Sequence, residues 1–247
     1  MSDSTLEPMV RNLSYRAVLD AEDRRAILNL PCTVKMIERL HYIVRERERA
    51  THACVMLSGY SVRSKVVGDG NRQIVAIHLK GDAVDLHNSI LDIADHSVQA
   101  LVSSKVAMIP RDAILRIAEK RPKVGLAMWR ETLVDGSISR EWVANVGRRD
   151  AKTRLAHLLC EFAVRMKVAG LAGENHFELP MTQEQLADTT GLTSVHVNRT
   201  MRAMESEGLI KRPNPRAVTY DDWRRLAEVG DFDTNYLHLP PNEPALA

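Results

Sequence analysis

The 247-residue sequence contains few cysteines and few aromatic residues, and it has no long apolar run. Its three cysteines, Cys32, Cys54 and Cys160, form no CxxC pair, so there is no local framework for a thiolate zinc or iron–sulfur site. We expect three reduced thiols, with a redox-sensing cysteine as the alternative. No segment approaches the roughly 18 consecutive apolar residues of a membrane span, and the polar N-terminus is unlike a secretory signal. The sequence therefore predicts a cytoplasmic protein without a membrane partner.

The overall charge is nearly balanced and identifies no partner. Lys and Arg number 34 against 32 Asp and Glu, which gives a net charge of +2, so any surface for nucleic acid must come from local arrangement. A hydrophobic content of 45% is ordinary for a globular chain, and the length fits one large domain or two small ones. The GxSxG, P-loop and HExxH motifs of common catalytic sites are absent, so we do not expect an enzyme.

Residues 33–110 have the pattern of short β-strands. Two runs rich in β-branched residues, 59–67 and 72–79, flank Asp69-Gly70, which is the strongest short-range signal of a hairpin. A further run, 97–109, alternates between apolar and polar residues. Strands at this spacing predict a small antiparallel β-roll.

Helical patterns lie on both sides of the β region. We expect helices over 21–30, with Asp20 as N-cap, and over 111–120, which Pro122 ends. A long helix is predicted over 123–145, and its apolar stripe needs a partner surface. Another helix is predicted over 150–168.

The most specific pattern begins with a short helix near the C-terminal third of the chain. Thr182-Gln-Glu-Gln185 is a capping box that starts a helix over 183–189. Ala187 leaves room for a second helix to cross closely. Gly191 then supplies a residue that tolerates the left-handed conformation at a corner.

A second helix over 194–205 follows, and Thr193 is its N-cap. Its inner face consists of Val197, Met201 and Met204. Its outer face consists of Ser194, His196, Asn198, Arg199 and Arg202. This spacing predicts a helix-turn-helix, whose second helix enters the major groove of DNA.

A two-stranded ribbon is predicted directly after the second helix. Residues 208–212 form its first strand, 213–215 its turn and 216–220 its return strand. Such a ribbon is a wing, and Lys211, Arg212 and Arg216 lie where phosphates would pass.

The local charge agrees with a DNA-binding segment. Residues 148–216 contain 11 Lys and Arg against 8 Asp and Glu, a balance of +3, and residues 217–247 contain 2 against 6, a balance of −4. Basic charge is therefore enriched where double-stranded DNA would bind, and the acidic C-terminal part should lie elsewhere.

A β-roll, a long helix and a winged helix-turn-helix together resemble the Crp–Fnr family of bacterial transcription regulators. The resemblance covers roughly residues 10–222 and is most specific over 182–210. It implies an α+β fold with an N-terminal antiparallel, jelly-roll-like β-roll, a long dimerisation helix and a C-terminal winged helix-turn-helix. It further implies a homodimer that recognises a two-fold symmetric operator, with RNA polymerase as a partner if the protein activates transcription.

The resemblance also assigns roles to residues of the helix-turn-helix. Base contacts are implied for Ser194, Val195 and Arg199, and phosphate contacts for Thr182, Glu184, Thr193 and His196. Arg199 fits a bidentate guanine contact, worth about 1–3 kcal/mol of discrimination. Val195 departs from the best-known members, which have Glu there, so we expect an unfamiliar half-site. Asn198 is a further candidate for adenine or phosphate.

The β-roll lacks the residues that hold a cyclic nucleotide in the family. Leu86 stands at the position of the ribose-binding Glu, and His96-Ser97 at that of the phosphate-binding Arg-Ser pair. We therefore expect no cyclic-nucleotide response, no cofactor and an unknown effector. Because His78, His87 and His96 are nine residues apart, no single element brings them together, and we expect no metal site. A haem or redox sensor that uses these histidines, Cys32 or Cys54 is the alternative.

These inferences predict four segments. Residues 1–122 are the sensor domain, 123–147 the dimerisation helix and hinge, 148–222 the DNA-binding domain and 223–247 a C-terminal extension with a loose tail over 239–247. A hinge near 145–150 would set the distance between recognition helices. For the dimer contact we expect Met128, Leu133, Ile138 and Trp142.

Overall fold

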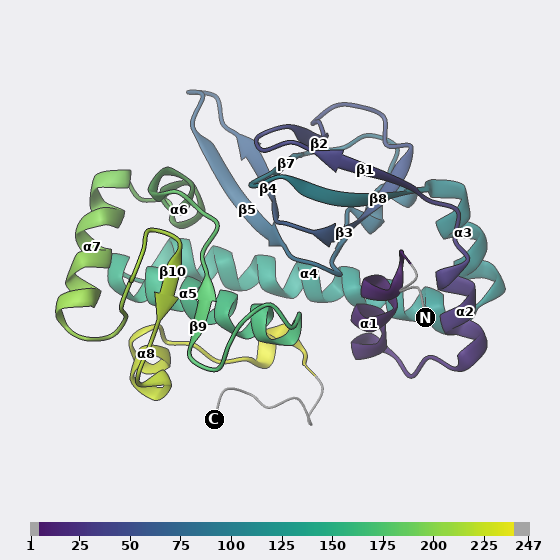
Figure 1. The fold of residues 1–247 in the computed structure, drawn as a ribbon. Helices are drawn as coiled ribbons and strands as arrows, with labels where there is room; N and C mark the ends of the chain where they lie inside the picture. Colours follow the sequence, from purple (N-terminus) through teal and green to yellow (C-terminus); the bar gives the residue numbers. More distant parts are fainter. Residues whose placement is uncertain (1–4, 240–247) are drawn as a thin grey trace. The chain divides into compact units, whose positions relative to one another are not determined.

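The computed structural model describes residues 5–239 (Figure 1). These residues form two compact units. The first comprises the chain up to Lys65 together with Ala76–Gly136, and the second comprises Val66–Val75 together with the chain from Ser137 onward. The expected division at 122, 147 and 222 stays a prediction, and most of the expected tail lies outside the described residues.

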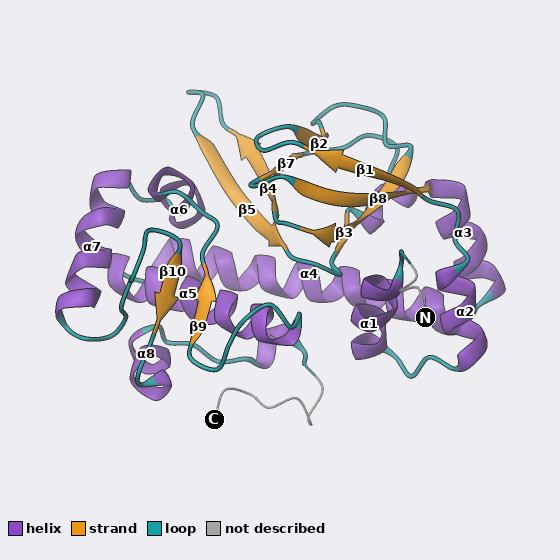
Figure 2. Ribbon diagram, viewed as in Figure 1, coloured by secondary structure: helices purple, strands orange, loops and turns teal. Residues whose placement is uncertain are grey.

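The β-roll consists of two four-stranded sheets, shown in orange in Figure 2. One sheet has the order β1-β8-β3-β6 and the other the order β2-β7-β4-β5. Their strands are β1 (Thr33–Ile37), β2 (Tyr42–Val44), β3 (His52–Ser58), β4 (Ser61–Val66), β5 (Arg72–His78), β6 (Ala83–Val84), β7 (Ser97–Ala100) and β8 (Ser104–Pro110). The predicted hairpin is confirmed as β4 and β5. The run at 97–109 forms two strands, β7 and β8.

Strand β3 separates two apolar clusters because its side chains alternate between two faces. Ala53 and Val55 belong to the larger cluster, which also includes side chains of the helices. Cys54 and Met56 belong to a smaller cluster with Val84, Val98 and Val106. Both faces of β3 are therefore buried.

Three helices and the beginning of a fourth cover the first unit. They are α1 (Glu7–Arg16), α2 (Ala21–Leu28), α3 (Arg111–Lys120) and α4 (Pro122–Arg148). The predicted cap of α2 is confirmed, since the Asp20 carboxylate accepts hydrogen bonds from the backbone N–H groups of Glu22 and Asp23. Helix α1 has no counterpart in the sequence-based expectation. It buries Met9, Val10 and Leu13 in the larger cluster.

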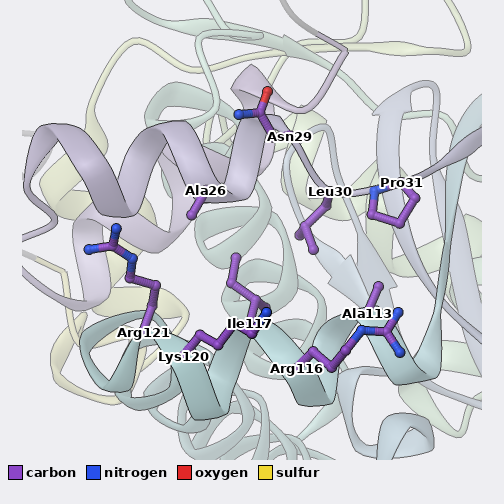
Figure 3. Close-up of a pocket in the computed structure, with 9 residues that line it drawn as sticks. All are labelled: Ala26, Asn29, Leu30, Pro31, Ala113, Arg116, Ile117, Lys120 and Arg121. Carbon is purple, nitrogen blue, oxygen red and sulfur yellow. The ribbon is translucent and has the colours of Figure 1, made fainter.

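A hollow lies between α2 and α3 (Figure 3). Ala26, Leu30 and Ile117 form its apolar part, and Arg116 and Lys120 are among its basic lining residues.

The second unit is built around α5 (Ala151–Val168), which is buried continuously from Leu155 to Val164. The Asp150 carboxylate caps it by accepting from the backbone N–H groups of Lys152 and Thr153. The other elements are β9 (His176–Glu178), α6 (Gln183–Thr190), α7 (Ser194–Ser206), β10 (Ala217–Thr219), α8 (Trp223–Val229) and a 3-10 turn, η2 (Asn235–Leu237).

The predicted wing is only partly correct. The expected strand over 208–212 is reduced to a single bridge, in which the Lys211 and Thr219 backbones exchange hydrogen bonds of 2.8 and 2.9 Å. The three-residue strand β10 pairs instead with β9, with Val218 opposite Phe177. Phe177 is buried and contacts Phe162 of α5, so the apolar anchor of the ribbon comes from before the helix-turn-helix.

Among the described residues, no helix is both long and apolar enough to cross a membrane.

Candidate nucleic-acid interface

The start of α6 is fixed by the capping box that the sequence predicts. The backbone N–H of Gln185 donates to Thr182 Oγ1 at 3.2 Å, and the backbone N–H of Thr182 donates to Gln185 Oε1 at 2.8 Å. Both bonds satisfy donors that the first turn of a helix leaves open. Thr182 and Glu184 remain exposed at this end of α6.

The turn between α6 and α7 depends on a left-handed residue and on a cation from α5. Gly191 has φ of 64°, a conformation that glycine adopts at little cost. The Arg154 guanidinium donates to the carbonyl oxygen of Thr190 at 2.6 Å, which satisfies an acceptor at the end of α6. Helix α7 then begins after Thr193, whose Oγ1 accepts from the backbone N–H of His196 at 3.2 Å.

The two faces of α7 differ as expected. The inner face is buried at Val197, Met201 and Met204. The outer face exposes Ser194, Val195, Arg199 and Arg202. Val195 is 78% exposed, which is unusual for an apolar side chain and leaves it free to contact a thymine methyl. Arg199 and Arg202 form no ion pair with any described residue.

Two other side chains of the predicted row are partly engaged within the chain. Asn198 Nδ2 donates to Gln183 Oε1 at 2.9 Å, so this amide is turned toward the start of α6. His196 is half-buried. This orientation of Asn198 could not be read from helical spacing, because its partner lies 15 residues earlier.

The three cations of the predicted wing have different surroundings. Lys211 Nζ lies 2.5 Å from Asp221 Oδ2, and Arg212 Nη2 lies 2.9 Å from Glu205 Oε2. Arg216 is exposed and forms no ion pair with the described residues. Since an acid already balances the first two charges, Arg216 is the wing cation best placed for a phosphate.

Of the side chains predicted for the dimer contact, only Leu133 is exposed. Met128 and Trp142 are buried within their own chain, where Trp142 Nε1 donates to Glu161 Oε2 at 2.8 Å, and Ile138 is half-buried. The exposed apolar side chains of α4 are Leu126, Trp129, Leu133 and Val143.

The residues that the family resemblance places at the cyclic-nucleotide site are engaged within the chain. Leu86, at the ribose-binding position, is buried in the larger apolar cluster. Ser97 Oγ accepts the backbone N–H of Glu46 at 3.0 Å. His96 is held between two carboxylates, with Nε2 2.9 Å from Asp85 Oδ1 and Nδ1 2.6 Å from Asp95 Oδ1.

The charge of Arg63, which contacts Asp85, is also balanced by carboxylates. Arg63 donates to Asp85 Oδ1 from Nε and Nη2, at 3.2 and 2.9 Å, and to Asp135 Oδ2 from Nη1 at 2.7 Å. Burial opposes its charge, but Asp135 and Asp85 outweigh that effect and raise the pKa of Arg63. A cyclic phosphate needs an available cation, and its ribose needs an acceptor, so these residues do not fit a cyclic nucleotide.

Two of the three cysteines, Cys54 and Cys160, are buried, whereas Cys32 is half-buried. Burial raises the pKa of Cys54 to about 12 and also raises the pKa of Cys160. Cys54 Sγ donates to Met108 Sδ at 3.4 Å, inside the β-roll. A thiol must ionise to react, so these two thiols are protected.

The nine-residue spacing of the histidines did not predict a cluster that the structure shows, which consists of Asp85, His87 and His96. His87 and His96 lie with their ring centroids 5.4 Å apart, and Asp85 lies beside both. Asp85 has φ of 59° and directly precedes the 3-10 helix Leu86–Ser89, which contains His87. His96 lies further along the chain, directly before β7. A left-handed aspartate cannot be recognised by hydrophobic periodicity.

Comparison with known proteins agrees with both halves of the fold. Residues 34–121 match the cyclic nucleotide-binding domain family, and residues 153–229 match the Crp-like helix-turn-helix domain family. The transcriptional activatory protein AadR of Rhodopseudomonas palustris is 30% identical over 189 residues, which cover 76% of this chain and 74% of that protein. The transcriptional activator protein FnrL of Cereibacter sphaeroides is 29% identical over 183 residues, 73% of each chain. The structure of FixK2 from Bradyrhizobium japonicum has the same fold, with a TM-score of 0.75 and 24% identity over 81% of this chain and 98% of that one.

The fold and the exposed helix of the second unit thus define a transcription regulator with a DNA-binding helix-turn-helix. The chain belongs to the Crp–Fnr family.

Proposed function

We propose that this protein is a homodimeric, sequence-specific regulator that binds a two-fold symmetric operator in the cytoplasm and catalyses no reaction. The observation that supports this most is the outer face of α7, where Ser194, Val195 and Arg199 are exposed on a helix capped at its start. Base edges in the major groove are recognised by such side chains from the N-terminal part of a recognition helix.

Each exposed side chain of α7 has a different part in base recognition. Arg199 makes a bidentate contact with guanine O6 and N7, and Val195 contacts a thymine methyl. Ser194 contacts a base edge, and Thr193 contacts a phosphate, which the backbone N–H groups at the helix start favour. Arg202 and Arg216 add contacts to the backbone of the DNA.

The exposed apolar stripe of α4 supports a dimer. At 100° per residue, Leu126, Trp129, Leu133 and Val143 fall within an arc of about 100°, the width of an interface stripe. The buried Met128 and Trp142 lie on a different side of the same helix. Two copies of α4 packed along this stripe would place two recognition helices about a two-fold axis.

The relatives are named as activators, and we propose activation here too, with RNA polymerase as the partner. Helix α4 ends at Arg148 and α5 begins at Ala151, so a hinge between them sets the spacing of the recognition helices. An effector would act by binding two such arrangements unequally.

The sensor does not respond to cyclic nucleotides in this proposal. Leu86 provides no ribose acceptor, and Arg63 is saturated by Asp85 and Asp135. Titration calorimetry with cyclic AMP should therefore show no saturable binding. Saturable micromolar binding would contradict this part of the proposal.

The main test is recovery of bound fragments from sheared genomic DNA of the host, followed by sequencing. We expect a two-fold symmetric motif with half-sites about 10 base pairs apart. The Arg199→Ala variant is the matched control, and the motif that it enriches should have lost its preference at one base pair of each half-site. An asymmetric motif, or the same motif recovered by the variant, would contradict the proposed mode of recognition.

A further inference from the structure

Three potential metal ligands converge at the edge of the β-roll. One ligand atom from each of Asp85, His87 and His96 lies within 4.8 Å of the other two. His96 Nε2 is 2.9 Å and His87 Nε2 is 3.8 Å from Asp85 Oδ1. Around a tetrahedral ion with bonds of about 2.0–2.2 Å, donor atoms lie roughly 3.3–3.6 Å apart. The side chains would therefore have to shift on binding, with the 3.8 Å pair moving closer and the 2.9 Å pair moving apart.

Only one of the two Asp85 carboxylate oxygens accepts hydrogen bonds from the described residues. Its Oδ1 accepts hydrogen bonds from Arg63 and His96. Its Oδ2 is buried and has no hydrogen-bond partner among residues 5–239, and the side chain is 1% exposed. An unsatisfied carboxylate oxygen in the interior costs free energy, and a cation would remove that cost.

A second carboxylate fixes the orientation of one histidine. His96 Nδ1 lies 2.6 Å from Asp95 Oδ1, which leaves Nε2 directed at Asp85, and a bound ion would displace the proton that Nε2 donates to that carboxylate. Metal-binding histidines commonly donate their second ring N–H to a carboxylate in this way. The Asp95 side chain is 80% exposed, so its contact with His96 is not imposed by packing.

The surrounding charge permits a divalent ion. Arg63 is 2.7 Å from Asp135 and 2.9 Å from Asp85, so each of its contacts is with a carboxylate. The short segment that follows Asp85 also contains Asn88 and Ser89, whose buried side-chain polar atoms have no hydrogen-bond partner in the part of the chain that the structure describes.

We propose that Asp85, His87 and His96 bind one divalent transition-metal ion, with Zn²⁺ as the probe that best represents the class. Two imidazoles and one carboxylate, without a thiolate, suit Zn²⁺, Co²⁺ or Fe²⁺ rather than Mg²⁺ or Ca²⁺. Three protein ligands leave a fourth position for water. The site does not depend on the proposed DNA recognition, since all three ligands belong to the first unit.

The experiment is a titration of the chelator-treated, full-length protein with Zn²⁺, in competition with a chromophoric chelator. We expect one equivalent per chain. Co²⁺ in place of Zn²⁺ should give visible d–d bands from a protein-bound ion. No stoichiometric binding of either ion would overturn the proposal.

Three variants locate the ion. His87→Ala removes one ligand and should abolish stoichiometric binding. Asp95→Asn keeps every ligand and changes an exposed residue, so the fold is retained, and it should weaken Zn²⁺ by about 10–100-fold. His41→Ala is the control, since His41 is exposed and lies outside the cluster, and it should bind as the unchanged protein does. Unchanged affinity in both His87→Ala and Asp95→Asn would place the metal elsewhere and refute the assignment.

Discussion

Single side chains of the helix-turn-helix differ in how free they are to meet DNA. Arg199 and Arg216 are exposed without an ion pair among the described residues, whereas Lys211 and Arg212 each face an acid. A paired cation must exchange its acid for a phosphate, so its net contribution to binding is smaller. The residues named from spacing alone are therefore not equivalent.

The first prediction concerns Arg199→Ala. We expect a loss of about 1–3 kcal/mol on the operator and relaxed preference at one base pair, because a bidentate guanine contact is removed. The measurement is affinity for the operator and for a set of operators with single base-pair changes. The matched control is Arg216→Ala, which removes the same charge from the wing.

The control should behave differently from the variant. Arg216→Ala should weaken all sequences alike and reduce the salt slope by about 1, as expected of a phosphate contact. If Arg199→Ala also weakened every operator equally, Arg199 would be a phosphate contact and the assignment of base recognition would be wrong.

At the scale of elements, local signals predicted the capped helices and the β4–β5 hairpin, but not helix α1 or the pairing of strands distant in sequence. Caps such as Thr182 and Asp20 act within four residues, so they could be recognised in the sequence, and the structure confirms them. The pairing of β9 with β10 joins residues about 40 apart through strands of three residues each, too short for a periodic pattern. The cluster of Asp85, His87 and His96 could not be predicted either, because these residues meet only in the folded chain.

The second prediction compares two glycines. Gly191→Ala should destabilise the protein by about 1–2 kcal/mol, because φ is 64° and the new methyl would lie 3.1 Å from Val146 Cγ1. Gly147→Ala lies within α4 with no atom within 4 Å of the new methyl, so it should stabilise by about 0.5–1 kcal/mol. Chemical denaturation measures both. Equal effects of the two substitutions would contradict the role of Gly191 as the corner.

The third prediction concerns pH and His157 of α5. Its Nδ1 donates to the carbonyl oxygen of Gly230 at 3.0 Å, and burial, followed by the charge of Arg149, lowers its pKa below the ordinary 6.5. The unfolded chain then binds a proton more readily than the folded one. The contribution of His157 to the free energy of unfolding is fully present above about pH 6.5. It decreases as the pH falls, by at most about 1.4 kcal/mol per pH unit.

The check is the free energy of unfolding between pH 5 and 8 for the protein and for His157→Gln. We expect a shallower decline toward pH 5 in the variant. A decline of equal steepness in both would mean that other groups account for the acid sensitivity.

At the scale of the whole molecule, α4 shows why a helix can be predicted while its faces are not. The sequence contains apolar residues around most of α4, including Met128 and Trp142, which the chain itself covers. Only the tertiary structure separates these from Leu126, Trp129, Leu133 and Val143, which remain exposed. A monomer would leave these four apolar side chains of one helix face in water, and soluble proteins usually cover larger apolar patches with a partner.

The last prediction follows from that stripe. Trp129 is 65% exposed, and Trp129→Glu should give a folded monomer, because burying an unpaired carboxylate in a helix–helix interface is costly. Sedimentation should show half the mass of the unchanged protein, and binding to a two-half-site operator should fall while binding to one half-site is kept. Val18→Glu is the control, since Val18 is 92% exposed and lies outside α4. If Val18→Glu alone produced the monomer, the interface would lie away from α4. A dimer that persisted in both variants would show that Trp129 is not at the contact.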